Sequence, residues 1–339
     1  MGVSITEILP VHSIEFEDLA NKVVVIDGFL VLYQFLATIR QPDGTPLKDS
    51  HGRITSHLQG LFARSVNLMQ KGVKLAFVFD GTAPALKKRV QESRSKAKTA
   101  AKEAYDDALK QENIELMQKY AGRTSRLTPE MVTEAKRLLD ALGLPWIQAP
   151  SEGEAQAAAI VADGKAYAVG TQDADAFLFG APRLIKNLTV SEKKKAPNKL
   201  SYISVKPELI ELNELLSKNE ITQDQLIAIG ILVGTDYNPG GVKGIGVKKA
   251  LKLIKEHSNL SDVFNSVSWN EKNDIKWEEI FNTIRNIPVT RDYSLKWGKP
   301  SEEKIIKILC EEHDFSFERV KSAIDKLKNV SQQGLGQWV

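Results

Sequence analysis

The stretch Lys22-Val-Val-Val-Ile-Asp27 decides the fold, and Lys74-Leu-Ala-Phe-Val-Phe-Asp80 repeats its design. Each is a short, continuous apolar run that ends in an aspartate, which is typical of a strand buried on both faces of a parallel sheet. Between them, residues 54–69 carry apolar side chains at helical spacing. The two runs and this helix predict a β-α-β unit with parallel strands.

Further strands are expected at residues 145–149, 167–170 and 184–189. Because strands alternate with helices, we predict an α/β fold with a mostly parallel central sheet and helices on both faces. Residues 82–128 are rich in Lys, Glu, Ala and Gln and poor in large apolar side chains, which predicts helices that project from the core. Further on, a glycine-rich loop at residues 239–246 is expected to join two helices.

Composition places the chain among ordinary globular proteins, with 339 residues, 42% hydrophobic and 26% charged. It contains no apolar run long enough to span a bilayer and no secretory signal in its first twenty residues. We therefore expect a protein that works inside the cell without a membrane partner, in the cytoplasm or nucleoid if its source is archaeal and in the nucleus if it is eukaryotic. We also expect a monomer. The single cysteine, Cys310, cannot form an internal disulfide.

The net charge of +3 does not by itself indicate nucleic acid, but its distribution is uneven. Residues 87–102 hold seven basic residues and one acid, and residues 243–255 hold five lysines and no acid. Either block alone would be interpreted as solvated surface. Two such blocks, each beside a distinctive motif, favour a polyanionic partner.

Seven acidic residues stand where predicted apolar elements end. They are Asp27, Asp80, Glu152, Glu154, Asp173, Asp175 and Asp236. In open α/β sheets, sites form at the carboxyl ends of the strands, so these side chains are expected to converge. Close carboxylates repel one another unless cations lie among them, and ligands that are all oxygen suit Mg²⁺ or Mn²⁺. Two such ions about 4 Å apart can activate water against a phosphodiester, so the predicted reaction is phosphoryl transfer to water.

Each acid also has a structural alternative. Ser151-Glu-Gly-Glu154 fits a capping box, and an aspartate after a strand can cap a helix or make a turn. Asp173 and Asp175 are harder to explain this way, because in an extended chain they would point to the same side as uncompensated like charges. Taken together, the acids favour a metal site.

Several longer motifs, in order along nearly the whole chain, resemble those of the flap endonucleases, above all the archaeal members. They are Met1-Gly-Val3, Val25-Ile-Asp-Gly28 ahead of Tyr33-Gln-Phe-Leu36, Val78-Phe-Asp-Gly81, Ala149-Pro-Ser-Glu-Gly-Glu-Ala-Gln-Ala157, Thr171-Gln-Asp-Ala-Asp175 and Gly234-Thr-Asp-Tyr-Asn-Pro-Gly-Gly-Val242. The resemblance implies a Mg²⁺-dependent 5′ flap endonuclease with 5′-3′ exonuclease activity, acting in replication, during Okazaki fragment maturation, and in repair. One departure is Gly28-Phe-Leu30 after Asp27, where relatives carry a small residue and then a polar one.

The same resemblance implies roles for single residues. The seven acids correspond to the two-metal site, and Lys87 and Arg94 to basic residues placed against the scissile phosphate at the base of a helical arch. Tyr33 corresponds to an aromatic residue that stacks on a terminal base, and Gly2 to an amino terminus near the metals. Arg40 and Gln41 fall in the region that seats a one-nucleotide 3′ flap. Without the resemblance, Lys87 and Arg94 would be interpreted as solvated helix surface and Tyr33 as a half-buried aromatic.

The glycine-rich loop resembles the family's helix-hairpin-helix-like element, which grips duplex backbone through loop N–H groups and a bound monovalent cation such as K⁺. Its candidate contacts are Gly241, Lys243, Gly244, Gly246, Lys248 and Lys249. A nucleotide-binding P-loop is excluded, because Val247 and Lys248 follow where Lys and Ser or Thr are required. A plain turn between helices remains the alternative.

The end of the chain resembles the peptide by which these enzymes bind the sliding clamp. Gln332, Leu335 and Trp338 take the glutamine, aliphatic and first aromatic positions, and Val339 replaces the second aromatic. The expected layout is a nuclease region at 1–98, an arch at 99–128, a second nuclease region at 129–258, a helical region at 259–328 and an unstructured clamp-binding tail at 329–339. Two rivals are a related 5′ nuclease for gaps, bubbles or Holliday junctions, and a non-catalytic clamp adaptor that binds DNA.

Overall fold

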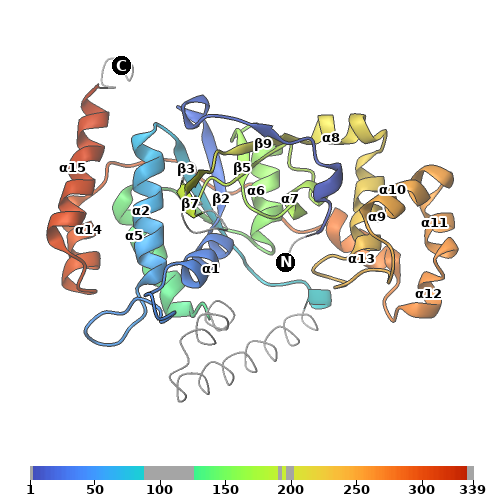
Figure 1. Ribbon diagram of the computed structural model, residues 1–339, viewed down its shortest axis with the longest axis horizontal. Coiled ribbons are helices and arrows are strands. Elements are labelled where there is room, and N and C mark those ends of the chain that lie inside the picture. The colour runs from blue at the N-terminus through green and yellow to red at the C-terminus, as the bar shows by residue number, and fades with distance from the viewer. Residues whose placement is uncertain (1–2, 88–125, 190–192, 196–201, 334–339) are drawn as a thin grey trace.

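A seven-stranded sheet forms the centre of the protein in a computed structural model, which describes residues 3–87, 126–189, 193–195 and 202–333 (Figure 1). The strand order is β1-β9-β6-β5-β2-β3-β4. The strands are β1 (His12–Ser13), β2 (Val23–Asp27), β3 (Lys74–Phe79), β4 (Trp146–Gln148), β5 (Ala168–Gly170), β6 (Arg183–Lys186) and β9 (Glu208–Glu211). The run from β6 to β4 is parallel, which confirms the mostly parallel sheet, while β9 and β1 pair antiparallel at the edge and were not predicted.

The central strands are buried on both faces, which explains their uninterrupted apolar sequences. In β2, Val25 packs into the apolar cluster on one face of the sheet and Ile26 into the cluster on the other. Val78 and Phe77 of β3 divide in the same way. The alternation fixes the register, so the carboxyl ends of β2 and β3 lie side by side.

Helices cover both faces, as predicted (Figure 1). One face carries α1 (Gly28–Thr38), α2 (Ser56–Gln70), α5 (Pro129–Leu142), α14 (Glu302–Ile306) and α15 (Phe317–Gln333). The other carries α6 (Gly153–Ala162), α7 (Asp175–Leu178), α8 (Leu212–Asn219), α9 (Gln223–Val233), α10 (Val247–Glu256), α11 (Leu260–Ser266), α12 (Trp269–Lys272) and α13 (Trp277–Arg285). The helix α2 is the predicted crossover between β2 and β3. A small antiparallel hairpin, β7 (Lys193–Lys195) with β8 (Tyr202–Ser204), follows β6.

An extended segment, residues 287–301, connects the helices of the two faces. The buried side-chain amide of Gln156 holds it by donating to the carbonyl of Thr290 (2.8 Å) and accepting from its N–H (2.7 Å). Further along, Gly298 donates to the carbonyl of Gly143 (2.9 Å). As a result, α11–α13 lie beside α9 and α10, whereas α14 and α15 pack on α5 and α2.

Two segments for which the sequence made a prediction lie wholly or partly outside the described residues. Most of the predicted projecting helices, at 88–125, lie outside the described residues, as do residues 334–339. The expected lack of structure from residue 329 onward is wrong for 329–333, because α15 continues to Gln333. Among the described residues, no helix is both long and apolar enough to cross a membrane.

Candidate active site

Asp27 lies at the end of β2, in the middle of the sheet. Its carboxylate caps α1 by accepting the N–H of Leu30 (3.0 Å), so Asp27 does form the helix cap that was the structural alternative for this residue. Burial, and then the charge of Asp80, raise the pKa of Asp27 to about 8. A helix cap does not explain why a second carboxylate, that of Asp80, lies close enough to raise this pKa. Asp27 therefore also belongs to a cluster of acids.

Asp80 follows β3 and faces the start of α6. Its Oδ1 atom accepts the N–H of Gly153 (2.6 Å), and a Cβ atom at Gly153 would lie only 2.7 Å from that oxygen. Burial raises the pKa of Asp80, and the charge of Asp236 raises it further, against the effects of Gly153 and Lys87. Glycine at 153 therefore allows the N-terminus of α6 to approach the carboxylate directly.

Glu152 and Glu154 open α6, but they do not form the capping box. Ser151 donates its hydroxyl to the carbonyl of Thr82 (3.1 Å), and Glu154 accepts from the hydroxyl of Thr171 (3.0 Å). The capping alternative for Glu154 is therefore wrong. Thr171 was missed from the sequence, where its only signal was a hydroxyl two residues before Asp173.

The two glutamates point into different parts of the cluster. Burial raises the pKa of both; for Glu152 the neighbouring acids that add to this effect are Asp80 and Asp236. For Glu154 they are Asp175, Asp27 and Asp173. Asp236 acts on Glu152 and also on Asp175, so the acids form one continuous cluster in which the two glutamates have different neighbours.

Asp173 and Asp175 are not in an extended strand, because β5 ends at Gly170 and Asp175 begins α7. The argument that extended geometry puts them on one side is therefore wrong. Asp173 nevertheless lies close enough to act on Asp175: burial raises the pKa of Asp175 to about 7, with contributions from the charges of Asp236 and Asp173. Asp175 also accepts the backbone N–H of Val3 (2.5 Å), which brings the start of the chain to the site.

Lys87 lies among these acids. Its Nζ is 2.5 Å from Glu152 Oε2 and 3.3 Å from Asp236 Oδ2, and its side chain is only 14% exposed. Burial alone would lower the pKa of the ammonium, but the charges of Glu152, Asp236 and Asp80 raise it. Solvated helix surface is therefore the wrong interpretation of Lys87.

The cluster fits divalent cations. All of its potential metal ligands are carboxylate oxygens, and several of these side chains are buried against one another. In addition, the Oε1 atom of Glu152 is buried without a hydrogen-bond partner. Among the described residues, no three acid, His or Cys side chains are already gathered tightly enough to hold one ion. Mg²⁺ usually keeps several waters and takes one or two carboxylates, so a loose cluster of acids suits it without a closed cage.

Tyr33 lies on α1 and is 36% exposed, which matches the half-buried aromatic of the structural alternative. Burial raises the pKa of its phenol, and the charge of Asp80 adds to the effect, so it borders the acids. Gly28 and Phe29 on the same helix belong to the segment where the sequence departs from the family motif, and packing explains both residues. A Cβ at Gly28 would lie 2.7 Å from the ring of Phe79, and Phe29 packs edge-to-face on that ring at 5.9 Å.

The loop between α9 and α10 holds four glycines with positive φ, namely Gly234, Gly240, Gly241 and Gly244. A Cβ at Gly241 would lie 2.3 Å from the carbonyl oxygen of Leu232, so only glycine fits there. The candidate lysines beside it, Lys243, Lys248 and Lys249, are all exposed. Gly246 caps α10, and space is open around it.

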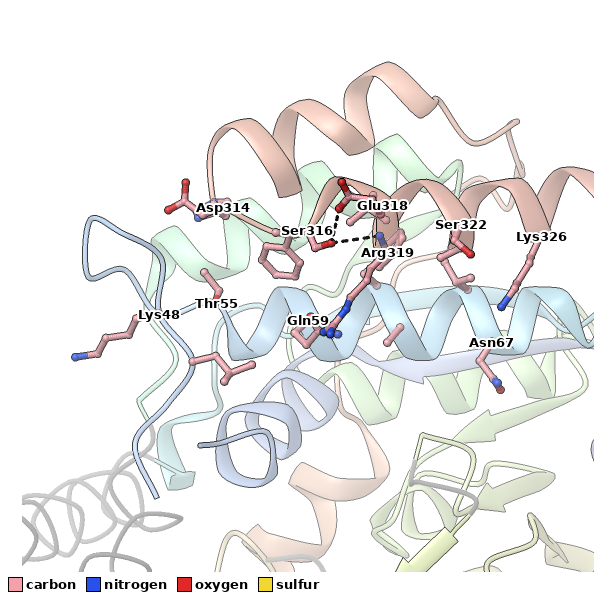
Figure 2. A pocket seen from close by; sticks show the side chains of 18 of the residues that line it. Lys48, Thr55, Gln59, Asn67, Asp314, Ser316, Glu318, Arg319, Ser322 and Lys326 are labelled. Atoms are coloured by element: carbon pink, nitrogen blue, oxygen red, sulfur yellow. Dashed lines mark hydrogen bonds between the residues drawn. The ribbon is translucent and has the colours of Figure 1, made fainter. Parts of the chain in front are cut away.

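A cavity of about 720 Å³ lies between α2 and α15, away from the acids (Figure 2). Gln41 lines it, together with residues that were not predicted, among them Gln59, Ser316, Arg319 and Lys326. Figure 2 shows Arg319 extending from α15 toward α2 beside Gln59. Arg40 does not line this cavity; its guanidinium donates to the carbonyls of Leu36 (3.1 Å) and Gly44 (2.9 Å) and so holds the loop that carries Gln41.

Some predicted site residues lie outside the described residues. They are Gly2, Arg94, Leu335, Trp338 and Val339. Gln332 lies in the last turn of α15, but its side chain is not described.

Comparison with known proteins gives consistent matches along the chain. The XPG N-terminal domain matches residues 1–101 and the XPG I-region matches residues 143–236. Flap endonuclease 1 of Staphylothermus marinus is 51% identical, over 100% of this chain and 99% of the relative. Flap endonuclease 1 of Pyrococcus furiosus is 49% identical, over 98% and 97% of the two chains.

Solved structures show the same likeness. Flap endonuclease-1 from Methanococcus jannaschii superposes with a TM-score of 0.77 at 43% identity, covering 97% of this chain and 98% of that one. The catalytic core of Rad2 in complex with DNA substrate, at 23% identity, superposes with a TM-score of 0.72 over 96% of this chain and 100% of that one, and shares the fold.

Proposed function

The chain belongs to the flap endonuclease 1 family, and from this membership we propose how its own residues carry out the reaction. It is a structure-specific 5′ flap endonuclease that hydrolyses DNA phosphodiesters in replication and repair, with the dependence on divalent metal that is general in the family. The full-length matches to flap endonucleases outweigh the rival assignments to other 5′ nucleases and to a non-catalytic adaptor. We assign Mg²⁺ as the metal, with Mn²⁺ as a substitute.

The observation that carries the site assignment is the convergence of buried and half-buried carboxylates into one cluster. We assign Asp80, Glu152 and Asp236 to one ion and Glu154, Asp173 and Asp175 to the other, with Asp27 between them. When bound, two such ions supply an activated water and neutralise charge on the leaving oxygen. The hydroxyl of Thr171 and the N–H of Gly153 orient Glu154 and Asp80 for this task.

Lys87 has two successive roles in this proposal. Without substrate, its ammonium neutralises part of the charge of Glu152 and Asp236. On arrival of a phosphodiester it donates to the phosphoryl oxygens instead, where a fixed positive group stabilises developing charge. Arg94 is assigned the same second role by resemblance, and Tyr33, at the border of the acids, stacks on the terminal base.

DNA contacts are assigned to two further places. The loop with Gly241, Gly244 and Gly246 approaches duplex phosphates, assisted by Lys243, Lys248 and Lys249 and by a bound K⁺. The cavity lined by Gln41, Arg319 and Lys326 receives a one-nucleotide 3′ flap, with Arg40 fixing the loop beside it. Its three basic side chains, Lys48, Arg319 and Lys326, and its polar side chains suit a nucleotide. The tail from Gln332 to Val339 binds the sliding clamp, and the enzyme acts as a monomer.

Replacement of Asp173 with Ala tests the metal assignment. We expect cleavage of a 5′ flap substrate to be lost while flap binding in the absence of divalent cations is retained. The matched control is Asp292→Ala, an exposed aspartate far along the chain from the acids. Unchanged cleavage by the Asp173 variant would remove the assignment.

A further inference from the structure

The backbone after β3 is joined closely to the backbone that leads into α6. The carbonyl of Phe79 accepts the N–H of Ala149 (2.8 Å), and the N–H of Gly81 donates to the carbonyl of Ser151 (2.6 Å). Only glycine fits at 81, because a Cβ atom there would lie 2.1 Å from the carbonyl oxygen of Ala149. This pairing sets the distance between Asp80 and the start of α6.

The carbonyl of Asp80 lies in the middle of this junction. Among the described residues, it takes no part in the backbone pairing. Instead, it accepts Nε2 of Gln148, at the end of β4, at 2.6 Å. The same nitrogen also donates to the carbonyl of Phe79 (3.2 Å). A carbonyl this close to a buried cluster is costly to leave without a donor, so the amide of Gln148 stabilises the backbone at Asp80.

Lys136 of α5 fixes the direction in which this amide points. Its Nζ donates to Oε1 of Gln148 (2.8 Å). An ammonium group can only donate and a backbone carbonyl can only accept, so the amide oxygen must face Lys136 and the amide nitrogen must face Asp80. Lys136 is itself held over the rings of Trp146 (4.3 Å) and Phe79 (4.9 Å), because a cation is attracted to an aromatic face. The contacts thus run from α5 to the backbone of a proposed metal ligand.

The direction of the Asp80 carboxylate depends on this backbone, because the carboxylate meets the start of α6 at short range. Its Oδ1 atom accepts the N–H of Gly153 at 2.6 Å, one residue after Glu152. A small rotation of the peptide that follows Asp80 would therefore shift the carboxylate relative to Glu152. Groups that coordinate metals commonly depend on such outer partners for their orientation.

We propose that Gln148 is a positioning residue for the metal site: it holds the carbonyl of Asp80, Lys136 holds its amide in turn, and together they direct the Asp80 carboxylate toward a divalent cation. This role rests on the proposed assignment of Asp80 as a metal ligand. It adds two residues outside the cluster of acids to those that determine the metal affinity.

The variant that tests this role is Gln148→Glu, which keeps the shape and the acceptor for Lys136 but replaces the donor to Asp80 with an oxygen. Mn²⁺ is the probe, and its binding to the full chain without DNA is measured by electron paramagnetic resonance. We expect the Kd for Mn²⁺ to rise about tenfold, as is typical when a metal ligand loses an outer partner. The added negative charge would by itself attract the cation, so weaker binding can be ascribed to the lost hydrogen bond.

Cleavage and DNA binding give a second measurement on the same variant. The Mg²⁺ concentration for half-maximal single-turnover cleavage of a 5′ flap should rise by a similar factor, whereas the Kd for flap DNA in EDTA should not change. If Gln148→Glu does not fold, as checked by circular dichroism, Gln148→Met takes its place, because it removes the donor without adding a charge.

Two further variants separate the contributions. Lys136→Met keeps an unbranched stem over the rings but removes the donor that orients the amide, so it should weaken Mn²⁺ binding by a smaller factor. Unchanged binding in Lys136→Met would remove Lys136 from the proposal. Asn270→Asp, an amide-to-acid change at an exposed position of α12, is the matched control and should leave Mn²⁺ binding unchanged.

Asp80→Asn distinguishes failure of this role from failure of the metal assignment. If Asp80→Asn weakens Mn²⁺ binding but Gln148→Glu does not, the proposed role of Gln148 is overturned while the assignment of Asp80 stands. If Asp80→Asn itself leaves Mn²⁺ binding unchanged, the assignment of Asp80 fails and the role of Gln148 fails with it.

Discussion

Nζ of Lys87 lies 2.5 Å from Oε2 of Glu152, so the ammonium occupies a position between carboxylates that would otherwise repel one another. Lys87→Ala should therefore slow cleavage by about a hundredfold or more, because the group that we propose to stabilise the phosphoryl oxygens is lost. Single-turnover rates on a 5′ flap substrate measure this. Lys218→Ala, which removes an exposed lysine on α8 outside the basic blocks, is the matched control. Equal rates for both variants would contradict the assignment.

Gly153 should not tolerate a side chain. In Gly153→Ala, the new methyl group would lie about 2.7 Å from Asp80 Oδ1, so the carboxylate or the start of α6 must shift. We expect a loss of about 1–3 kcal/mol of folding free energy and at least a tenfold loss of activity. Denaturant unfolding and cleavage assays measure the two effects. Gly298→Ala, whose new methyl group would make only an ordinary contact at 3.5 Å with the Cα of Gly143, should change neither by a comparable amount.

Acid should weaken the contact between the loop before α2 and the turn before α15. At this contact, Asp49 Oδ2 lies 3.1 Å from Nδ1 of His313. The pKa of Asp49 is about 2 in the folded protein against an ordinary value of 3.8, so the unfolded chain binds more protons between these values. The stability contributed by Asp49 is present above about pH 4 and is lost as the pH falls toward about 2. Asp49→Asn should flatten the decline of unfolding free energy over this window, whereas Asp292→Asn, at an exposed position, should leave it unchanged.

The clamp-binding tail should be separable from catalysis. Deletion of residues 332–339 should abolish stimulation by the sliding clamp and leave basal cleavage intact, because the acids lie on other elements. Restoring an aromatic at Val339 should strengthen clamp binding in a titration by surface plasmon resonance. Stimulation that persists after the deletion would remove the tail from the proposal.

The sequence predicted the elements that repeat a simple physical pattern. The apolar runs of β2 and β3 ending in Asp27 and Asp80 marked both the sheet and the edge where the acids meet. It could not predict that Glu152 and Glu154 turn toward different partners, because the side-chain directions depend on Thr171 and Lys87, contacts made only after folding. The cavity between α2 and α15 was missed for a related reason: its walls come from distant segments, and Arg319 has no local signal.

The first of the acids ends β2, whereas Asp236 follows α9, far later in the chain. A polypeptide still emerging from the ribosome, or one clipped before α9, therefore lacks part of the charge that the site requires. On the proposed assignment of Asp236, cleavage activity is expected only after most of the chain has been made and packed.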